Sequence, residues 1–240
     1  MVDIANIGLP AGMELARTER GLALRGDGME LVQDFSDLLG RLRPDRLSRE
    51  LLVRAARVKG RGAPASAVGA AFEGGPGAEP PFAVDATAGL GEDAFLLAAA
   101  GFSVLLCESD PVICALLQDA LERARIHPDP RLAAPAVRMR VHAGDSIGAL
   151  AGLDRAPDVV YLDPMFPARR KSAAVKKKFQ LLHRLEAPCS NEGEMLAAAI
   201  AARPRKVVIK RPVKAPCLAG AKPSHSIGGK AVRFDVIVPA

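Results

Sequence analysis

An acid, an aromatic ring and two prolines lie close together in the stretch Asp163 to Pro167. The residues before it, Asp158 to Leu162, are mostly apolar and predict a short buried strand of a parallel sheet. The carboxyl ends of such strands form the edge at which open α/β sheets bind their ligands. A carboxylate at Asp163 and a ring at Phe166 therefore predict a ligand site. The alternative is an ordinary strand-to-loop turn that the prolines stiffen.

A glycine-rich turn, Asp85 to Ala94, follows another predicted strand and precedes a helix. Gly89 and Gly91 let the backbone turn tightly and approach a ligand at the helix N-terminus, where free N–H groups favour a carboxylate or phosphate. The G-x-G-x-x-A spacing matches a dinucleotide fingerprint, and Glu108 lies 19 residues after Gly89, where a ribose-binding acid is expected. A nicotinamide dinucleotide is therefore one candidate ligand.

Acidic residues around this turn favour a different ligand. Asp85 and Asp93 offer carboxylates to an ammonium group, and the pair Asp145-Ser146 follows the third predicted strand. A nucleoside that carries an amino-acid tail fits these residues better than a pyrophosphate does, because carboxylates attract the ammonium group of the tail. The remaining alternative is a turn that only packs the helix on the strand.

Basic residues are concentrated in the last third of the chain. Residues 163–240 carry 16 Lys or Arg and 5 Asp or Glu, whereas residues 82–162 carry 6 and 11. The basic excess begins with the Asp163 loop, which predicts a large anionic partner at that edge of the sheet. The alternative is a solvated basic surface without a partner. The candidate contacts for such a partner are Arg169, Arg170, Lys171, Lys176, Lys177, Lys178, Lys210 and Arg211.

The composition is that of an ordinary globular protein, with 49% hydrophobic and 25% charged residues among 240. No apolar run reaches the roughly 18 to 20 residues that cross a bilayer, and the N-terminus lacks the pattern of an export signal. The four cysteines and four histidines show neither metal nor disulfide spacing. We therefore expect a cytoplasmic protein with no membrane contact and no metal site.

Three regions are predicted along the chain. Residues 1–59 form a small N-terminal α+β region, residues 60–81 a linker rich in Gly, Ala and Pro, and residues 82–240 the main domain. Within the first region, a β-hairpin is expected from Leu22 to Phe35 and a helix from Asp45 to about Lys59. An edge strand is possible within residues 1–20.

Strands alternate with helices from Phe82 onward, which predicts an α/β fold with a mostly parallel sheet. Strands are expected at residues 82–87, 103–107, 137–141, 158–162 and 206–210. Helices are expected at residues 92–100, from residue 110, and in a basic stretch at residues 172–185. An antiparallel hairpin at residues 224–238 is expected at the sheet edge.

Five segments occur in the order VDATAGLGEDAF (84–95), CESDP (107–111), VVYLDPMFPARRKSAAVKKK (159–178), VVIKRP (207–212) and GGKAVRFDVIV (228–238). Together they resemble the ribosomal RNA small subunit methyltransferase J family. The resemblance covers roughly residues 82–240 and is looser from Leu22 to Lys59. It implies a class I, Rossmann-like enzyme that uses S-adenosylmethionine (SAM) to methylate the exocyclic N2 amine of a guanine in 16S rRNA.

The resemblance also implies roles for individual residues. Cofactor contacts are implied for Glu92, Asp93, Glu108, Ser109, Asp145, Ser146 and Asp163, which join Asp85, Gly89 and Gly91 from the glycine turn. Carboxylate oxygens at Glu108 can accept both ribose hydroxyl hydrogens, and the Asp145-Ser146 pair can exchange hydrogen bonds around adenine.

The residues Asp163-Pro164-Met165-Phe166 resemble the D-P-P-Y/F motif of amino-group methyltransferases, with Met165 in place of the second proline. That resemblance implies that the Asp163 carboxylate and the Pro164 carbonyl accept hydrogen bonds from the target amine, while Phe166 stacks on the base. The basic residues would then hold 16S rRNA, or the small ribosomal subunit, through phosphates. A tRNA or DNA amino-methyltransferase, an NAD-dependent oxidoreductase and a non-catalytic RNA-binding module are the alternatives.

Overall fold

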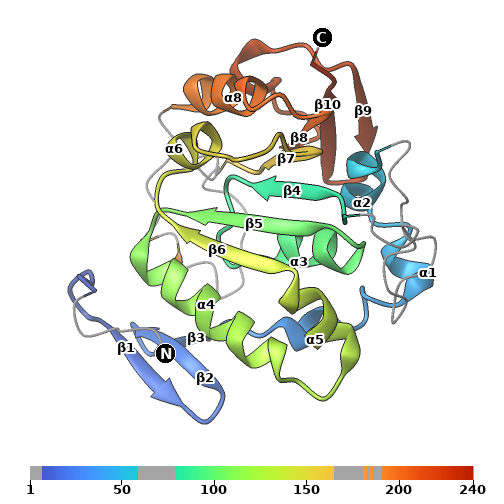
Figure 1. The fold of residues 1–240 in the computed structure, drawn as a ribbon. Coiled ribbons are helices and arrows are strands. Elements are labelled where there is room, and N and C mark those ends of the chain that lie inside the picture. The colour runs from blue at the N-terminus through green and yellow to red at the C-terminus, as the bar shows by residue number, and fades with distance from the viewer. Residues whose placement is uncertain (1–6, 59–78, 165–180, 183, 186–190, 240) are drawn as a thin grey trace.

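A seven-stranded sheet forms the centre of the computed structural model, which describes residues 7–58, 79–164, 181, 182, 184, 185 and 191–239 (Figure 1). Its strand order is β6-β5-β4-β7-β8-β10-β9. The strands are β4 (Phe82–Asp85), β5 (Ser103–Glu108), β6 (Met139–Ala143), β7 (Val159–Leu162), β8 (Lys206–Pro212), β9 (His225–Gly228) and β10 (Val232–Ile237). The first five pair in parallel, and β10 pairs antiparallel with both β8 and β9. The predicted α/β sheet with a C-terminal antiparallel hairpin is confirmed.

Helices cover both faces of this sheet. They are α3 (Glu92–Ala99), α4 (Pro111–Arg125), α5 (Pro130–Val137), α6 (Ser146–Ala151) and α8 (Glu192–Ala201). Successive side chains of a strand point to opposite faces, so Ala83 packs in one hydrophobic cluster with Phe95 of α3, while Val84 packs in another with Leu196 of α8. Apolar packing on both faces explains why β7 is buried along its whole length.

Two Asp-Pro pairs begin helices, and only the first was used in the prediction. Asp110 accepts hydrogen bonds from the backbone N–H groups of Val112 and Ile113 at the start of α4. Asp129 caps α5 by accepting a hydrogen bond from the Arg131 N–H. The sequence predicted a strand from Val137. That prediction was wrong at its start, because Val137 ends α5 and the strand begins at Met139. Helix α8 was not predicted.

The N-terminal region contains a separate sheet of three antiparallel strands, β1 (Met13–Thr18), β2 (Gly21–Gly26) and β3 (Met29–Val32). Asp27 and Gly28 connect β2 and β3 with positive φ angles of 51° and 69°, as a two-residue hairpin turn of type I′ requires. The predicted hairpin and the edge strand before it are therefore confirmed. The small sheet lies beside α4, where Leu22 and Leu24 share a hydrophobic cluster with Ile113 (Figure 1).

The single helix predicted from Asp45 to Lys59 is wrong. The chain forms two short helices, α1 (Pro44–Leu47) and α2 (Leu51–Ala56), separated by an extended Glu50 with φ −57° and ψ 128°. The Arg41 guanidinium donates two hydrogen bonds, of 2.8 and 2.9 Å, to the Glu50 carboxylate. This two-point contact lies at the position where the two helices are separated.

Residues from the N-terminal region complete the core of the main sheet. Phe35, in a short 3₁₀ turn (Phe35–Leu38), stacks on Phe95 of α3 with ring centroids 4.3 Å apart. Leu42 and Leu52 belong to the same hydrophobic cluster. The division at residues 60–81 stays a prediction, since residues 59–78 lie outside the described part. Across the ranges that the structure describes, none of the helices has the length and apolar character needed to cross a membrane.

Candidate active site

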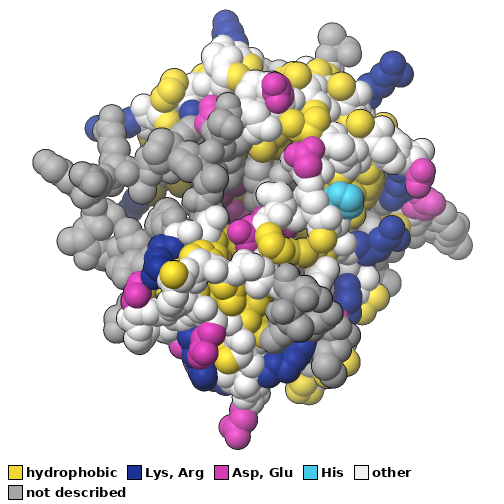
Figure 2. All heavy atoms as spheres, turned by 90° about the vertical axis from the view of Figure 1, so that its left-hand side faces the viewer, with side chains coloured by type: hydrophobic (Ala, Val, Ile, Leu, Met, Phe, Trp, Pro, Cys, Tyr) yellow, Lys and Arg dark blue, Asp and Glu magenta, His cyan; other side chains and the backbone are white. Residues whose placement is uncertain are grey.

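One cavity of about 820 Å³ opens where the parallel strands end. The arrows of β4, β5 and β6 in Figure 1 point to this edge, and Figure 2 looks at it from that side, with acidic side chains in the central hollow. A volume of this size lies within the range of roughly 300–1,000 Å³ that is typical of small-molecule sites. The predicted site residues that line it are Asp85, Gly89, Gly91, Glu92, Asp93, Glu108, Ser109, Asp145, Ser146, Asp163, Pro164 and Lys210.

The glycine turn brings the backbone close to this cavity. Gly89 and Gly91 have positive φ angles of 53° and 77°, a conformation that other residues adopt only with strain. A Cβ atom on Gly91 would lie 2.6 Å from Leu117 Cδ1, whereas a Cβ atom on Gly89 would meet nothing within 4 Å. Gly91 is therefore required by packing, while Gly89 borders open space on the cavity side.

This difference gives a testable prediction about stability. We expect Gly91→Ala to lower the free energy of unfolding by about 2–5 kcal/mol, because backbone strain and overpacking add. Gly89→Ala carries the strain alone, and we expect a loss of about 1–2 kcal/mol. Urea denaturation of the two variants and the parent protein measures both values. Equal losses for the two variants would contradict the packing argument.

Glu108, at the end of β5, is held in place by the backbone. The N–H groups of Gly89 and Asp110 each donate a hydrogen bond of 2.8 Å, one to each oxygen of the Glu108 carboxylate. Burial raises the pKa of Glu108, and these backbone hydrogen bonds partly offset that rise. The carboxylate is thus oriented before any ligand arrives and keeps further lone pairs free to accept hydrogen bonds.

Asp145 and Ser146 lie at the end of β6, where α6 begins. The Asp145 side chain accepts a hydrogen bond of 2.9 Å from the Gly148 N–H and so caps α6. Ser146 is buried against the cavity wall. Both predicted residues therefore border the same cavity as Glu108.

A hydrogen-bonded chain links the ends of β4 and β7. Asp85 is buried, and its carboxyl accepts a hydrogen bond of 3.1 Å from the Thr87 N–H. The Thr87 hydroxyl oxygen in turn accepts one of 2.7 Å from the Asp163 N–H. Burial raises the pKa of Asp85 to about 8, with the nearby charges of Asp93 and Asp163 adding to the effect. Thr87 therefore fixes the backbone from which the Asp163 side chain projects.

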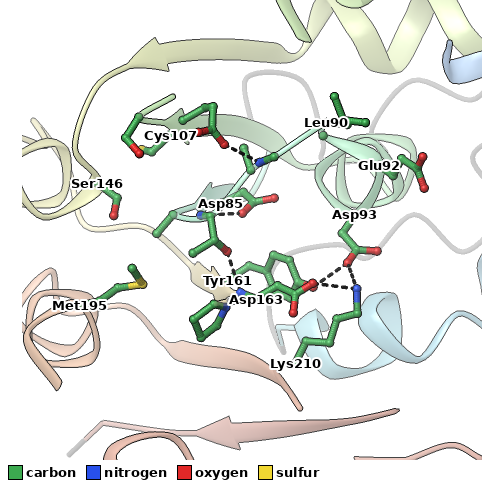
Figure 3. Close-up of a pocket in the computed structure, with 18 of the residues that line it drawn as sticks. Asp85, Leu90, Glu92, Asp93, Cys107, Ser146, Tyr161, Asp163, Met195 and Lys210 are labelled. Carbon is green, nitrogen blue, oxygen red and sulfur yellow. Dashed lines mark hydrogen bonds and ion pairs between the residues drawn. The ribbon is translucent and has the colours of Figure 1, made fainter. Parts of the chain in front are cut away.

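Lys210 of β8 lies between two carboxylates of the cavity (Figure 3). Its ammonium group donates to Asp93 Oδ2 at 2.7 Å and to Asp163 Oδ2 at 2.9 Å. The Tyr161 hydroxyl donates to the same Asp93 oxygen at 2.7 Å. Burial acts to raise the pKa of Asp93, but Lys210 and Tyr161 outweigh it and the pKa falls below its usual range. For Asp163, burial outweighs the effect of Lys210 and the pKa is raised.

Two of the cations predicted to contact RNA have other contacts in the structure. The Lys210 ammonium faces inward to Asp93 and Asp163, so it is not presented to an external phosphate. Arg211 is only 2% exposed, and its guanidinium donates to the Pro216 carbonyl at 2.9 Å. Alternate residues of a strand face opposite sides, so Lys210 borders the cavity while Arg211 packs into the interior.

Several cavity residues were not predicted. Arg41 and Glu50 reach it from the N-terminal region, and Leu182 and Met195 from beyond the Asp163 loop. No local sequence pattern distinguishes them, because long-range folding brings them there. Thr87 lay within the glycine turn that was singled out, where a hydroxyl two residues after Asp85 was the available signal.

The remaining predicted site residues lie outside the described residues. They are Phe166, Arg169, Arg170, Lys171, Lys176, Lys177 and Lys178. Within the part of the chain that the structure describes, no group of three or more His, Cys, Asp or Glu side chains is arranged to hold a metal ion.

The donor groups of the cavity fit SAM better than a dinucleotide. SAM carries an ammonium and a sulfonium cation, and Asp93 and Asp163 supply carboxylates on this side of the cavity. Glu108 is oriented to accept hydrogen bonds from ribose hydroxyl groups. A pyrophosphate at the glycine turn would instead face these acids and be repelled. The match to the dinucleotide fingerprint therefore does not indicate NAD.

Comparison with known proteins agrees with this geometry. A family model described as "Putative SAM-dependent methyltransferase" matches residues 12–239. The chain is 45% identical to the ribosomal RNA small subunit methyltransferase J of Thioalkalivibrio sulfidiphilus, over 98% of this chain and 90% of that protein. It is 41% identical to the protein of the same name from Pseudomonas aeruginosa, over 96% and 86%.

A solved structure is also similar. The SAM-dependent methyltransferase from Neisseria gonorrhoeae superposes with a TM-score of 0.69 and 28% identity, covering 97% of this chain and 85% of that one. The similarity to that structure and the match to the family model identify this protein as a SAM-dependent methyltransferase with SAM as its cofactor. The chain belongs to the ribosomal RNA small subunit methyltransferase J family.

Proposed function

We propose that the protein methylates the exocyclic N2 amine of one guanine in 16S rRNA, as free rRNA or within the small ribosomal subunit, in the cytoplasm. The observation that carries this proposal is the position of Asp163 and Pro164, which border the same cavity as Glu108 and the glycine turn. The residues that we assign to the amine acceptor and to the cofactor site thus line one cavity. The names of the relatives support small-subunit rRNA as the substrate.

The residue types suit methylation of an aromatic amine. The lone pair of the guanine N2 amine is delocalised into the ring, which makes the amine a weak nucleophile. The Asp163 carboxylate and the Pro164 carbonyl accept hydrogen bonds from its two N–H groups and favour localisation of the lone pair on nitrogen. SAM supplies an electrophilic methyl group when it is bound. Positioning the two reactants side by side contributes most of the acceleration.

The base must leave the RNA stack to reach Asp163. Enzymes that modify bases act on an extruded nucleotide and often hold it by stacking on an aromatic ring. Phe166, three residues after Asp163, is our candidate for that ring. The cations of residues 169–178 follow directly and are our candidates for the phosphate contacts that orient the RNA.

Those phosphate contacts predict a change in salt dependence. Replacing Lys176, Lys177 and Lys178 with alanine should weaken rRNA binding most at low salt, because the affinity of the parent protein includes counterion release. The plot of log affinity against log salt concentration should become shallower by about 2 units for three lost contacts. Fluorescence anisotropy between low and moderate salt measures the slope. Parallel plots for the two proteins would show that these lysines do not contact phosphates.

Methyl transfer from labelled SAM tests the substrate assignment. Naked 16S rRNA, assembled small subunits, tRNA and duplex DNA are offered in parallel, and the label is then mapped to a nucleoside. We expect label in N2-methylguanosine from one of the two ribosomal substrates. Label in tRNA or DNA alone, or on another atom, would refute the proposal while leaving the SAM-dependent chemistry intact.

A further inference from the structure

We propose that Lys210 is the positioning residue of the active site: it holds one oxygen of the Asp163 carboxylate and leaves the other oxygen to accept the substrate amine. The inference rests on the proposed amine methylation, since it assigns Asp163 to the acceptor role. It gives Lys210 a function inside the site in place of an external contact with RNA.

The two Asp163 oxygens have different surroundings. Oδ2 accepts the Lys210 hydrogen bond at 2.9 Å, whereas no hydrogen bond from a described residue reaches Oδ1. The Asp163 side chain keeps 38% of its surface exposed, although its backbone is fixed by Thr87. One oxygen is thus anchored to the protein, while the side chain as a whole borders the cavity.

Lys210 is itself anchored on its other side. Asp93 Oδ2 accepts hydrogen bonds from both Lys210 and Tyr161, each at 2.7 Å (Figure 3). Three secondary-structure elements, α3, β7 and β8, therefore meet at the Lys210 ammonium group. Turning Lys210 outward would leave Asp93 with Tyr161 and without its cation, in a site where the Asp93 side chain is 20% exposed. Such unpaired charges are costly to bury, so the inward position is favoured.

The charge of Lys210 also maintains the chemical form that Asp163 needs. A protonated carboxylic acid has lost acceptor capacity and carries an O–H donor, which is the wrong partner for an amine N–H. Burial and the charge of Asp93 act to raise the pKa of Asp163, and Lys210 and Arg211 act against them. The other ionisable groups around this cluster are Asp85, Tyr161 and Arg41. Lys210 is the member that contacts both carboxylates, so its removal should favour protonation of Asp163.

Two substitutions with opposite expected effects test this role. Lys210→Met removes the cation, so the acid limb of the pH profile of kcat should move to higher pH by about one unit or more. Asp93→Asn removes the carboxylate that competes for Lys210, so the same limb should move to lower pH. We expect Lys210→Met to reduce kcat about 10- to 100-fold, the cost of one charge-assisted hydrogen bond, with the KM for rRNA changed less than about threefold.

Lys210→Arg and Lys214→Met are the controls. Arginine keeps a cation beside Asp163, so its acid limb should stay near that of the parent protein. Lys214 is exposed just after β8, and Lys214→Met removes the same charge without a cavity contact. Its pH profile should be unchanged. Circular dichroism shows that each variant is folded.

A substrate-free measurement separates this inference from the proposed function. The Asp163 carboxyl carbon, labelled with carbon-13 and assigned with Asp163→Asn, is titrated by NMR in each variant. Its midpoint should rise in Lys210→Met and fall in Asp93→Asn. Unmoved midpoints, or shifts in one common direction, would overturn the role of Lys210 even if rRNA is methylated. Failure of the parent protein to methylate rRNA would instead refute the proposed function, and the titration would still decide the coupling.

Discussion

Asp163→Ala should lower kcat for methyl transfer by about 1,000-fold while leaving RNA affinity largely intact. The variant loses the carboxylate that accepts the amine hydrogen bond. Side chains that act as general acids or bases, or that stabilise charge in the transition state, typically contribute about 10²–10⁴-fold to the rate. It keeps Pro164, Glu108 and the glycine turn that border the cavity. Single-turnover transfer from labelled SAM measures the rate.

The loss must be distinguished from a general charge effect. Asp154→Ala is the matched control, because Asp154 is an exposed acid in the segment before β7. We expect its rate to equal that of the parent protein. Asp163→Asn adds a second comparison, since the amide keeps the shape and one acceptor oxygen but loses the charge. A fully active Asp163→Ala protein would remove that carboxylate from the mechanism.

Glu108→Ala should weaken binding of SAM and S-adenosylhomocysteine by about 100-fold. A carboxylate that accepts hydrogen bonds from two hydroxyl groups contributes about 1.5–3 kcal/mol per bond, and loss of part of this gives an effect of that size. The variant also frees the N–H groups of Gly89 and Asp110, which Glu108 now holds. Isothermal titration calorimetry measures the dissociation constant.

An exposed glutamate on α4 provides the control for this prediction. Glu122→Ala removes the same side chain from a surface that does not border the cavity, and we expect unchanged affinity. Glu108→Gln should fall between the two, because its amide presents N–H hydrogens to one of the two backbone N–H groups. Parent-like affinity in Glu108→Ala would show that the ribose hydroxyl groups bind elsewhere.

The segments predicted best are those whose evidence is local. The alternation of strands and helices from Phe82 onward gave the parallel sheet, and the Asp-Gly turn at residues 27–28 gave the N-terminal hairpin. The glycine turn, Glu108 and the Asp163 segment were each identified from residue type and spacing. Residue type and spacing were sufficient to identify these segments because the carboxyl ends of the strands in a parallel sheet meet at one edge.

Errors arose where contacts distant in the sequence decided the outcome. The helix expected from Asp45 is interrupted at Glu50, whose side chain binds Arg41, and periodicity alone does not reveal that pair. Arg211 was expected at the surface because its residue type is basic, yet β8 directs it into the interior. In both cases packing overrode a local preference.

Sequence alone determined the architecture of the main domain and the set of acids around its ligand edge, because the alternation of strands and helices predicts a parallel sheet whose strand ends meet at one edge. Only the tertiary structure decided how the acids are paired. Asp93 and Asp163 are 70 positions apart in the chain, and both bind Lys210, which a third segment supplies. Hydrogen bonds and ion pairs act over a few ångströms in space, so the pairing of Asp93 and Asp163 through Lys210 depends on side-chain positions that no local pattern encodes.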